Sequence, residues 1–457
     1  MEKKLKRQLN STFLIAYIMK HLKIDECAYE SHFYQRKPKK ISGSSLIASF
    51  WKMQQLGKNT LRNWAVHLGV LISETITKQS LNERLNARAV EFVKLVLKKA
   101  LNSTLNKQWL KAGDAIINSI GGHFNRIMIR DSTTQQLPSQ FSEIYPGSHS
   151  HGKPTAIVRI QSLFNFTARK WVDFQISPYT DNDQSAASCI SPFLEKNDLI
   201  LQDLGYFALK WIKQVIENQY LITKWKPGVS LYLLDGTQIK LLELLKEKGQ
   251  IDQMVLVGRT ENIRMRLVAR KLPRAKAKRI IKEAREDRHS KTNHSEEYYE
   301  LLKYEIYLTN VPSDMVSPKE VAQLYGLRWY IEILFKSWKS YDNFKKMFNK
   351  ERVSLHRVQF TLYAMLIKFV VLFSHVYGQV QRKIQSADPK KQISVLKFMD
   401  VANDLLDQIL LMKAPCDLNR LIPQFSKHAT YLKHSKRNNI IDKYQFVNDL
   451  HITILQT

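Results

Sequence analysis

The residue types best suited to chemistry lie close together in one segment of the C-terminal half. Tyr325, Arg328, Glu332 and Lys339 are separated by three, four and seven positions, and Lys336 lies between the last two. Because an α-helix has 3.6 residues per turn, this spacing predicts one helix with a stripe made of a phenol, a guanidinium, a carboxylate and two ammonium groups. A simple surface ion pair would explain Arg328 and Glu332 alone. It would not explain the ordered set.

Two aspartates complete a possible metal site. Asp131 and Asp203 each follow an apolar run that is typical of a β-strand. Mg²⁺ prefers oxygen ligands, and two such ions about 4 Å apart can hold the attacking and leaving oxygens of a phosphoryl transfer. Asp131, Asp203 and Glu332 are therefore candidates for a metal-binding catalytic site. The alternative for each aspartate is a turn or a helix cap, and Asp235, which precedes Gly236, fits a turn better.

The charge of the chain indicates a polyanionic partner. The 457 residues contain 71 Lys and Arg against 41 Asp and Glu, which leaves a net charge of +30. The excess is spread over 1–120, 259–292 and 340–457, so it favours an extended duplex over a single anchoring patch. Three widely spaced cysteines form neither a disulfide framework nor a zinc pattern, and this favours a reducing compartment such as the cytoplasm.

The pattern of apolar residues predicts how the chain positions these groups. Strands and helices alternate after about residue 124, which indicates a mixed α/β sheet. The expected regions are a helical DNA-binding region at 1–120, the first part of a catalytic core at 121–228, a mostly β insertion at 229–312, a core helix carrying Glu332 at 313–345, and a helical region at 346–457.

Two segments allow more than one interpretation. Residues 61–101 resemble a helix-turn-helix with Gly69 in the turn and a recognition helix near Ser80–Arg88, but a plain helical bundle fits equally well. Residues 360–377 are apolar enough to suggest a membrane span, yet they include Lys368 and His375. Since ionisable residues are costly inside hydrocarbon, we expect a buried core helix there. We recognise no secretory signal at the start of the sequence.

The Tyr-Arg-Glu-Lys spacing resembles, residue for residue, the signature of the DDE transposases of bacterial insertion sequences, in the "insertion sequence four" family. Asp131 in the sequence Arg-Asp-Ser-Thr resembles the first aspartate block of that family. Asp203, at the end of a strand and followed by Gly205 and Tyr206, resembles the second. The resemblance extends over about residues 125–345.

The resemblance implies a ribonuclease-H-like mixed-sheet core with a mostly β insertion between Asp203 and Glu332, flanked by helical N- and C-terminal regions. It also implies two Mg²⁺ or Mn²⁺ ions, double-stranded DNA as terminal inverted repeats and target, and a homodimer in a synaptic complex. Tyr325, Arg328 and Lys339 are then expected to contact phosphates, with Lys336 adding charge. Some members use a Trp of the insertion to hold a flipped base, whereas this sequence has no Trp between Trp225 and Trp329.

Three functions from different classes follow from these features. The first is a cut-and-paste transposase that acts in the bacterial cytoplasm, at the nucleoid. The second is a non-catalytic DNA-binding protein or repressor derived from a transposase, which would bind DNA without nicking it. The third is a membrane-surface protein, which requires residues 360–377 to lie in lipid. The intact set of carboxylates favours the first, and we expect no membrane partner.

Overall fold

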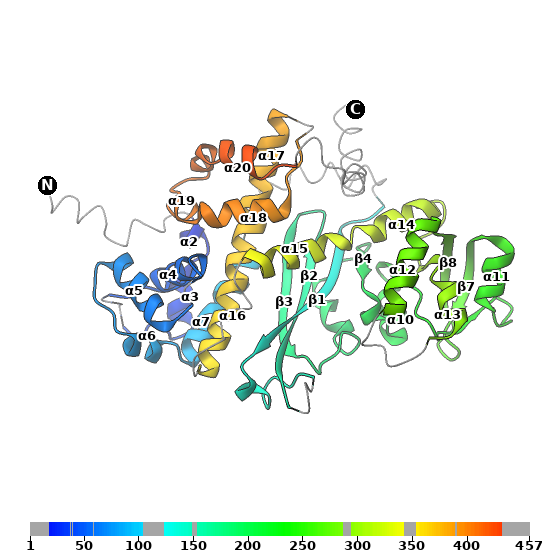
Figure 1. Cartoon of the computed structure of the whole chain (residues 1–457), viewed down its shortest axis with the longest axis horizontal. Helices are drawn as coiled ribbons and strands as arrows, with labels where there is room; N and C mark the ends of the chain where they lie inside the picture. The colour runs from blue at the N-terminus through cyan, green and yellow to red at the C-terminus, as the bar shows by residue number, and fades with distance from the viewer. Residues whose placement is uncertain are drawn as a thin grey trace.

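A mixed β-sheet lies at the centre of the molecule (Figure 1). The computed structural model describes residues 18–36, 38, 40–57, 59–103, 123–148, 153–286, 294–341, 353–388 and 391–431. In this part of the chain nine strands pair in the order β3-β2-β1-β4-β5-β9-β8-β7-β6. Their bounds are β1 Ile127–Leu137, β2 Ala156–Asn165, β3 Lys170–Pro178, β4 Leu199–Gln202, β5 Tyr220–Lys224, β6 Leu231–Tyr232, β7 Gln250–Val257, β8 Ile263–Lys271 and β9 Tyr304–Thr309.

The first five strands form the ribonuclease-H-like core that was predicted. β2 pairs antiparallel with both β1 and β3. β4 pairs parallel with β1 on one side and with β5 on the other, and α10 (Leu209–Val215) lies in the crossover between β4 and β5. The parallel strands bring their carboxyl ends to one edge of the sheet, and this edge holds the acidic residues described below.

Both faces of the central strands are buried, and this explains their unbroken apolar sequences. Side chains alternate between faces along a strand. Ile129 and Leu201 accordingly belong to the core on one side, beneath α14 (Pro318–Gly326), α15 (Trp329–Tyr341) and α16 (Leu355–Val370). Their neighbours Met128 and Ile200 belong to the core on the other side, with α10.

The strands at 229–312 do not form a sheet of their own. β9 pairs antiparallel with β5 at one side and with β8 at the other, so β6 to β9 extend the core sheet without interruption. The region is also more helical than expected, because the segment around Leu241, read as a strand, forms α11 (Leu241–Lys248). Two further helices cross it, α12 (Arg274–Glu286) and α13 (Glu296–Leu301).

The N-terminal region is helical, as expected, but its turn differs from the prediction. Its helices are α2 Ile18–His21, α3 Ile24–Glu30, α4 Gly43–Gln55, α5 Leu61–Ile72, α6 Lys78–Arg84 and α7 Ala87–Leu101. Gly69 lies inside α5, where a Cβ would lie 2.5 Å from the carbonyl oxygen of Glu74, so the glycine permits close packing and not a turn. The proposed recognition helix Ser80–Arg88 is divided between α6 and α7, because Asn86 caps a new helix. Its role in DNA binding stays a prediction.

The helical C-terminal region packs on the N-terminal helices at one end of the sheet (Figure 1). Trp51 donates its indole N–H to the carbonyl of Ala364 at 2.8 Å, across 313 positions of sequence. Residues 360–377 span α16 and a π-helix, Val371–Tyr377, and the helical stretch Leu355–Ala387 is apolar enough to cross a membrane by length and composition. Its most apolar window is 94% buried inside the protein, in agreement with a core helix. The remaining helices are α17 Gly378–Ala387, α18 Val395–Asp404, α19 Leu406–Leu410 and α20 Ile422–His428.

Candidate active site

The predicted aspartates are neighbours at the edge where the parallel strands end. Arg130 of β1 pairs with Gln202 of β4, so the next positions, Asp131 and Asp203, lie side by side. β1 continues to Leu137, and Asp131 therefore lies within its strand and not at the end that was expected. Asp203 directly follows β4 and caps a short 3₁₀ helix, Leu204–Tyr206, by accepting from the N–H of Gly205.

Glu332 approaches the aspartates from the helical layer. Asp131 and Asp203 follow Ile129 and Leu201 by two positions, so their side chains point to the same face, on which α15 packs against β1. Glu332 lies in the first turn of α15. The side chains of Asp203 and Glu332 are 43% exposed, whereas that of Asp131 is 15% exposed. Two of the three carboxylates are thus open to solvent.

The guanidinium of Arg328 joins all three carboxylates. Its Nη1 lies 3.0 Å from Oδ2 of Asp131 and 3.6 Å from Oδ1 of Asp203, and its Nη2 lies 2.5 Å from Oε1 of Glu332. The predicted ion pair between Arg328 and Glu332 therefore forms, but as one part of a four-residue cluster. Within the described part of the chain, no three acidic, His or Cys side chains lie close enough together to hold a metal ion as they stand, since this guanidinium separates them.

Burial gives Asp131 unusual proton chemistry. Removal from water raises the pKa of its carboxyl from 3.8 to about 7, and the charge of Arg328 opposes that rise. The carboxylates of Asp203 and Glu332 raise it further. The ionised form of Asp131 therefore depends on a nearby positive charge, which Arg328 supplies here. A divalent cation would satisfy the same requirement.

The helical stripe is interrupted at Arg328. α14 ends at Gly326 and α15 begins at Trp329, with Leu327 and Arg328 in a turn between them, so the single helix predicted around Glu332 is two helices. The break directs Arg328 toward the carboxylates. Its Nε is buried and has no hydrogen-bond partner.

The other three residues of the stripe differ in accessibility. Tyr325 is only 6% exposed, its ring lies 5.2 Å from that of Tyr307, and burial raises the pKa of its phenol. Lys336 is exposed on α15, and Lys339 is partly buried near the end of the same helix. The acidic cluster therefore includes Arg328 and Glu332 but not the two lysines. The expected phosphate contacts of all four residues stay predictions.

Asp235 lies apart from this cluster, as expected. Its carboxylate accepts a hydrogen bond from the N–H of Thr237 at 2.8 Å, and this bond lowers the pKa of the Asp235 carboxyl. Gly236 follows with a φ of +91°, a conformation that favours glycine. The Asp-Gly sequence thus forms a tight turn between β6 and α11.

Asp183 supports the turn that carries Asp203, and no pattern in the sequence indicated this residue. Asp183 accepts from Arg159 at 3.0 Å and from Gln161 at 2.8 Å, both on β2. A Cβ at Gly205 would lie 2.9 Å from Oδ2 of Asp183. Asp183 therefore packs directly against the turn that presents Asp203, and glycine is the residue that leaves room for it.

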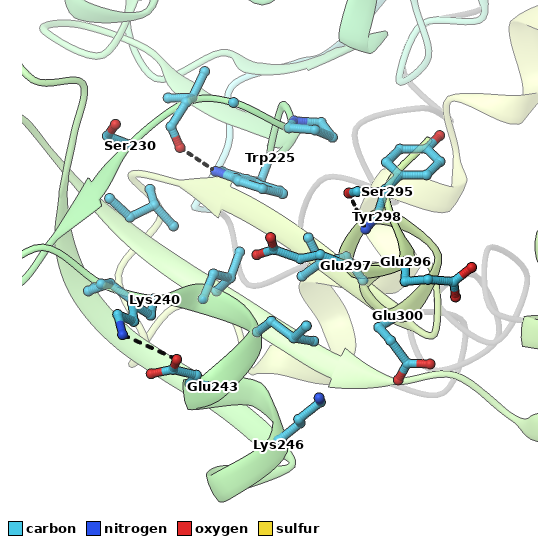
Figure 2. A pocket seen from close by; sticks show the side chains of 18 of the residues that line it. Trp225, Ser230, Lys240, Glu243, Lys246, Ser295, Glu296, Glu297, Tyr298 and Glu300 are labelled. Atoms are coloured by element: carbon cyan, nitrogen blue, oxygen red, sulfur yellow. Dashed lines mark hydrogen bonds and ion pairs between the residues drawn. The ribbon is translucent and has the colours of Figure 1, made fainter. Parts of the chain in front are cut away.

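Two cavities differ sharply in their charge. The larger, of about 1060 Å³, is lined by β6, α11 and α13 and carries four glutamates (Figure 2): Glu243, Glu296, Glu297 and Glu300. These carboxylates would repel a phosphate. The smaller, of about 410 Å³, adjoins the acidic cluster through Arg328 and also contains Lys224, Arg270 and Lys276. It therefore lies beside the cluster and carries a surplus of positive charge.

The order of the strands in the sheet is that of a ribonuclease-H-like protein. Residues 122–367 match the family model described as transposase DDE domain, and the chain belongs to that family. It is a DDE transposase.

Relatives over most of the chain agree with this assignment. The chain is 28% identical over 408 residues to a protein of Bacillus thuringiensis subsp. israelensis, the transposase for insertion sequence element IS231F, with 84% of this chain and 83% of that one covered. It is 26% identical over 399 residues to the transposase for insertion sequence element IS1151 of Clostridium perfringens, with 82% and 81% covered. Among solved structures it is similar to a piggyBac transposase synaptic complex with hairpin DNA, at 10% identity and a TM-score of 0.42, over 93% of this chain and 86% of that one.

Proposed function

We propose that the chain excises an insertion sequence by cutting double-stranded DNA at the ends of the element and joins the freed ends to target DNA. The observation that carries this proposal is the convergence of Asp131, Asp203 and Glu332 on a single guanidinium, beside β1 and at the carboxyl end of β4. Three carboxylates provide the oxygen donors that hard divalent cations prefer. Two of them are accessible to solvent, as ions and DNA require.

The proposed chemistry is two successive in-line displacements at phosphorus. Water attacks a phosphodiester, a new P–O bond forms, the bond to the 3′ oxygen breaks, and that oxygen gains a proton as a 3′-hydroxyl. The hydroxyl then attacks a second phosphodiester and displaces its 3′ oxygen, so the number of P–O bonds is conserved. Asp131, Asp203 and Glu332 would hold two Mg²⁺ or Mn²⁺ ions, which supply Lewis-acid stabilisation of the attacking and leaving oxygens.

Arg328 has a double role in this proposal. While the carboxylates hold no cation, it offsets part of their charge and lowers the pKa of the Asp131 carboxyl against the effect of burial. It must withdraw for the cations to bind, and its buried Nε, which lacks a partner, gains one if the guanidinium turns toward a phosphate. Tyr325, Lys336 and Lys339 are proposed to contact phosphates near the cleaved bond, each from the segment that carries Glu332.

The partners are proposed from the charge of the chain and from the functions of its relatives. A net charge of +30 favours double-stranded DNA, as terminal inverted repeats and as target. Two ends must be held together for a coupled excision, which favours a homodimer. The relatives named above are bacterial, so the proposed place of action is the bacterial cytoplasm. The direct test is metal-dependent nicking of a plasmid that carries the ends of the element. A protein that binds these ends but leaves them intact in Mg²⁺ is a repressor and not this enzyme.

Binding of end DNA is expected to weaken steeply with salt. Each phosphate that a Lys or Arg neutralises contributes about −0.9 to the slope of log K against log salt on duplex DNA. Because the basic excess is spread over three regions, we expect at least about five such contacts and a slope steeper than about −4. Fluorescence anisotropy titrations at four or five salt concentrations measure the slope. A slope near zero would show that the basic charge serves another purpose.

A further inference from the structure

The register of the sheet places a lysine in the same row as the catalytic aspartates. β1 and β4 pair with an offset of 72 residues, which aligns Asp131 with Asp203. β4 and β5 pair parallel with an offset of 21 residues, so the position beside Asp203 is Lys224. Lys224 in turn pairs with Tyr307 of β9. Because neighbouring strands lie about 4.8 Å apart, Lys224 is the next residue after Asp203 in the row that runs across the strands.

Lys224 projects into the smaller cavity, the one that shares Arg328 with the acidic cluster. Its side chain is exposed, and no carboxylate in the described part of the chain forms an ion pair with it. The ammonium lies 5.8 Å from the centre of the Tyr325 ring, within the range of a cation–π contact. Lys224 thus lies against an aromatic ring and near the carboxylates of Asp203 and Glu305, without an ion pair to either.

The back of the cavity is organised by one carboxylate. Glu305, on β9, accepts from Arg270 at 2.9 and 2.8 Å and forms an ion pair with Lys276 of α12 at 2.5 Å. Its side chain is only 12% exposed, and its two ion pairs hold Arg270 and Lys276 in place. Four cations and one carboxylate line a volume of about 410 Å³. The surplus of positive charge favours binding of an anion, and the volume of the cavity is sufficient for one nucleotide unit.

We propose that this cavity is a phosphate subsite, in which Lys224 binds a backbone phosphate of the DNA next to the one that is cleaved. The proposal rests on the proposed function, because it takes DNA as the anion that reaches the acidic cluster. Arg270 and Lys276, oriented by Glu305, add a positive field behind Lys224, while Tyr325 and Tyr307 form the wall between the row and the helices. A phosphate bound here fixes the position of the neighbouring scissile phosphate relative to Asp131 and Asp203, as positioning contacts to DNA backbones do.

The test replaces single phosphates of the DNA and the lysine in combination. Full-length protein is titrated with end duplexes in which one phosphate at a time near the cleavage site is a neutral methylphosphonate, and single-turnover cleavage in Mg²⁺ is followed on the same duplexes. Because a charge-assisted hydrogen bond contributes about 1.5–3 kcal/mol, Lys224→Ala is expected to lower affinity or cleavage by about tenfold or more on unmodified DNA. Lys224→Arg should keep most of the activity.

The diagnostic result is one position at which methylphosphonate lowers DNA affinity or cleavage by the wild type but causes no further loss in the Lys224→Ala variant. Lys240→Ala is the matched control, since Lys240 is an exposed lysine that lines the acidic cavity (Figure 2) and should respond like the wild type. Additive losses at every position, or a Lys224→Ala variant as active as the wild type, would overturn the subsite. The titrations do not require cleavage. If the wild type binds but fails to nick in Mg²⁺, the proposed function fails while Lys224 is still tested.

Discussion

Replacement of Asp131 or Asp203 by Asn, or of Glu332 by Gln, is expected to reduce strand cleavage at element ends by at least about 1,000-fold, since metal-assisted catalysis supplies several kcal/mol and each 1.36 kcal/mol is tenfold in rate. Each change keeps the shape of the side chain but removes a negative oxygen donor. Binding of end DNA should change by less than about threefold, because affinity comes mainly from basic contacts to phosphate. Single-turnover cleavage in Mg²⁺ and a parallel binding titration measure both effects.

Asp235→Ala is the matched control for these three variants. Asp235 is also an aspartate after an apolar run, but its carboxylate only supports the turn at Thr237. The Asp235→Ala variant should cleave at the wild-type rate. Cleavage by the wild type should stop when EDTA removes divalent metal. If Asp203→Asn cleaved normally while Asp235→Ala did not, the second metal ligand would have to be moved to β6, away from the carboxyl end of β4.

Removal of the guanidinium of Arg328 is expected to have the second-largest effect. Arg328→Ala should lower the cleavage rate by about 100-fold, in the range seen when one charge-stabilising group is removed, with a much smaller loss of DNA affinity. Arg328→Lys should be nearly as slow, because a lysine cannot place separate N–H groups on both Asp131 and Glu332 as Nη1 and Nη2 do. Single-turnover rates on pre-bound DNA measure this difference.

The metal-free protein provides an independent measure of the same cluster. Without Arg328 the three carboxylates face one another with no counter-charge, so the thermal unfolding temperature of Arg328→Ala in EDTA should fall below that of the wild type. Mg²⁺ should raise it more in the variant than in the wild type, because the ions no longer compete with a guanidinium. An equal response to Mg²⁺ in both proteins would show that Arg328 does not occupy the metal site.

Much of the core followed from local sequence. The apolar runs that end before Asp131 and Asp203 predicted strands, and strands form there because both of their faces are buried. The four-position spacing of Arg328 and Glu332 predicted an ion pair that does form. Asp235 followed by Gly236 predicted a turn. The ion pair and the turn join residues only a few positions apart, so local sequence determines them. The two strands were indicated by their unbroken apolar residues, which burial on both faces requires.

Features that depend on distant segments were missed or misplaced. The stripe from Tyr325 to Lys339 was taken as one helix, because periodicity does not reveal a two-residue break at Leu327 and Arg328. Local sequence predicts a mostly β insertion at 229–312 but not that its strands continue the core sheet, because the pairing of β9 with β5 joins strands about 85 positions apart. Gly69 was placed in a turn because its packing against the carbonyl of Glu74 depends on the path of the chain after α5.

The sequence by itself determined the groups from which the site is proposed: three carboxylates, an arginine and an excess of basic residues. Only the tertiary structure decided that Arg328 lies among all three carboxylates, that Tyr325 is buried, and that Lys224 shares a row with Asp131 and Asp203. The physical reason is that a residue's type and local spacing fix its own charge and conformation. Its neighbours across a sheet are set instead by strand register, which depends on the packing of both faces at once.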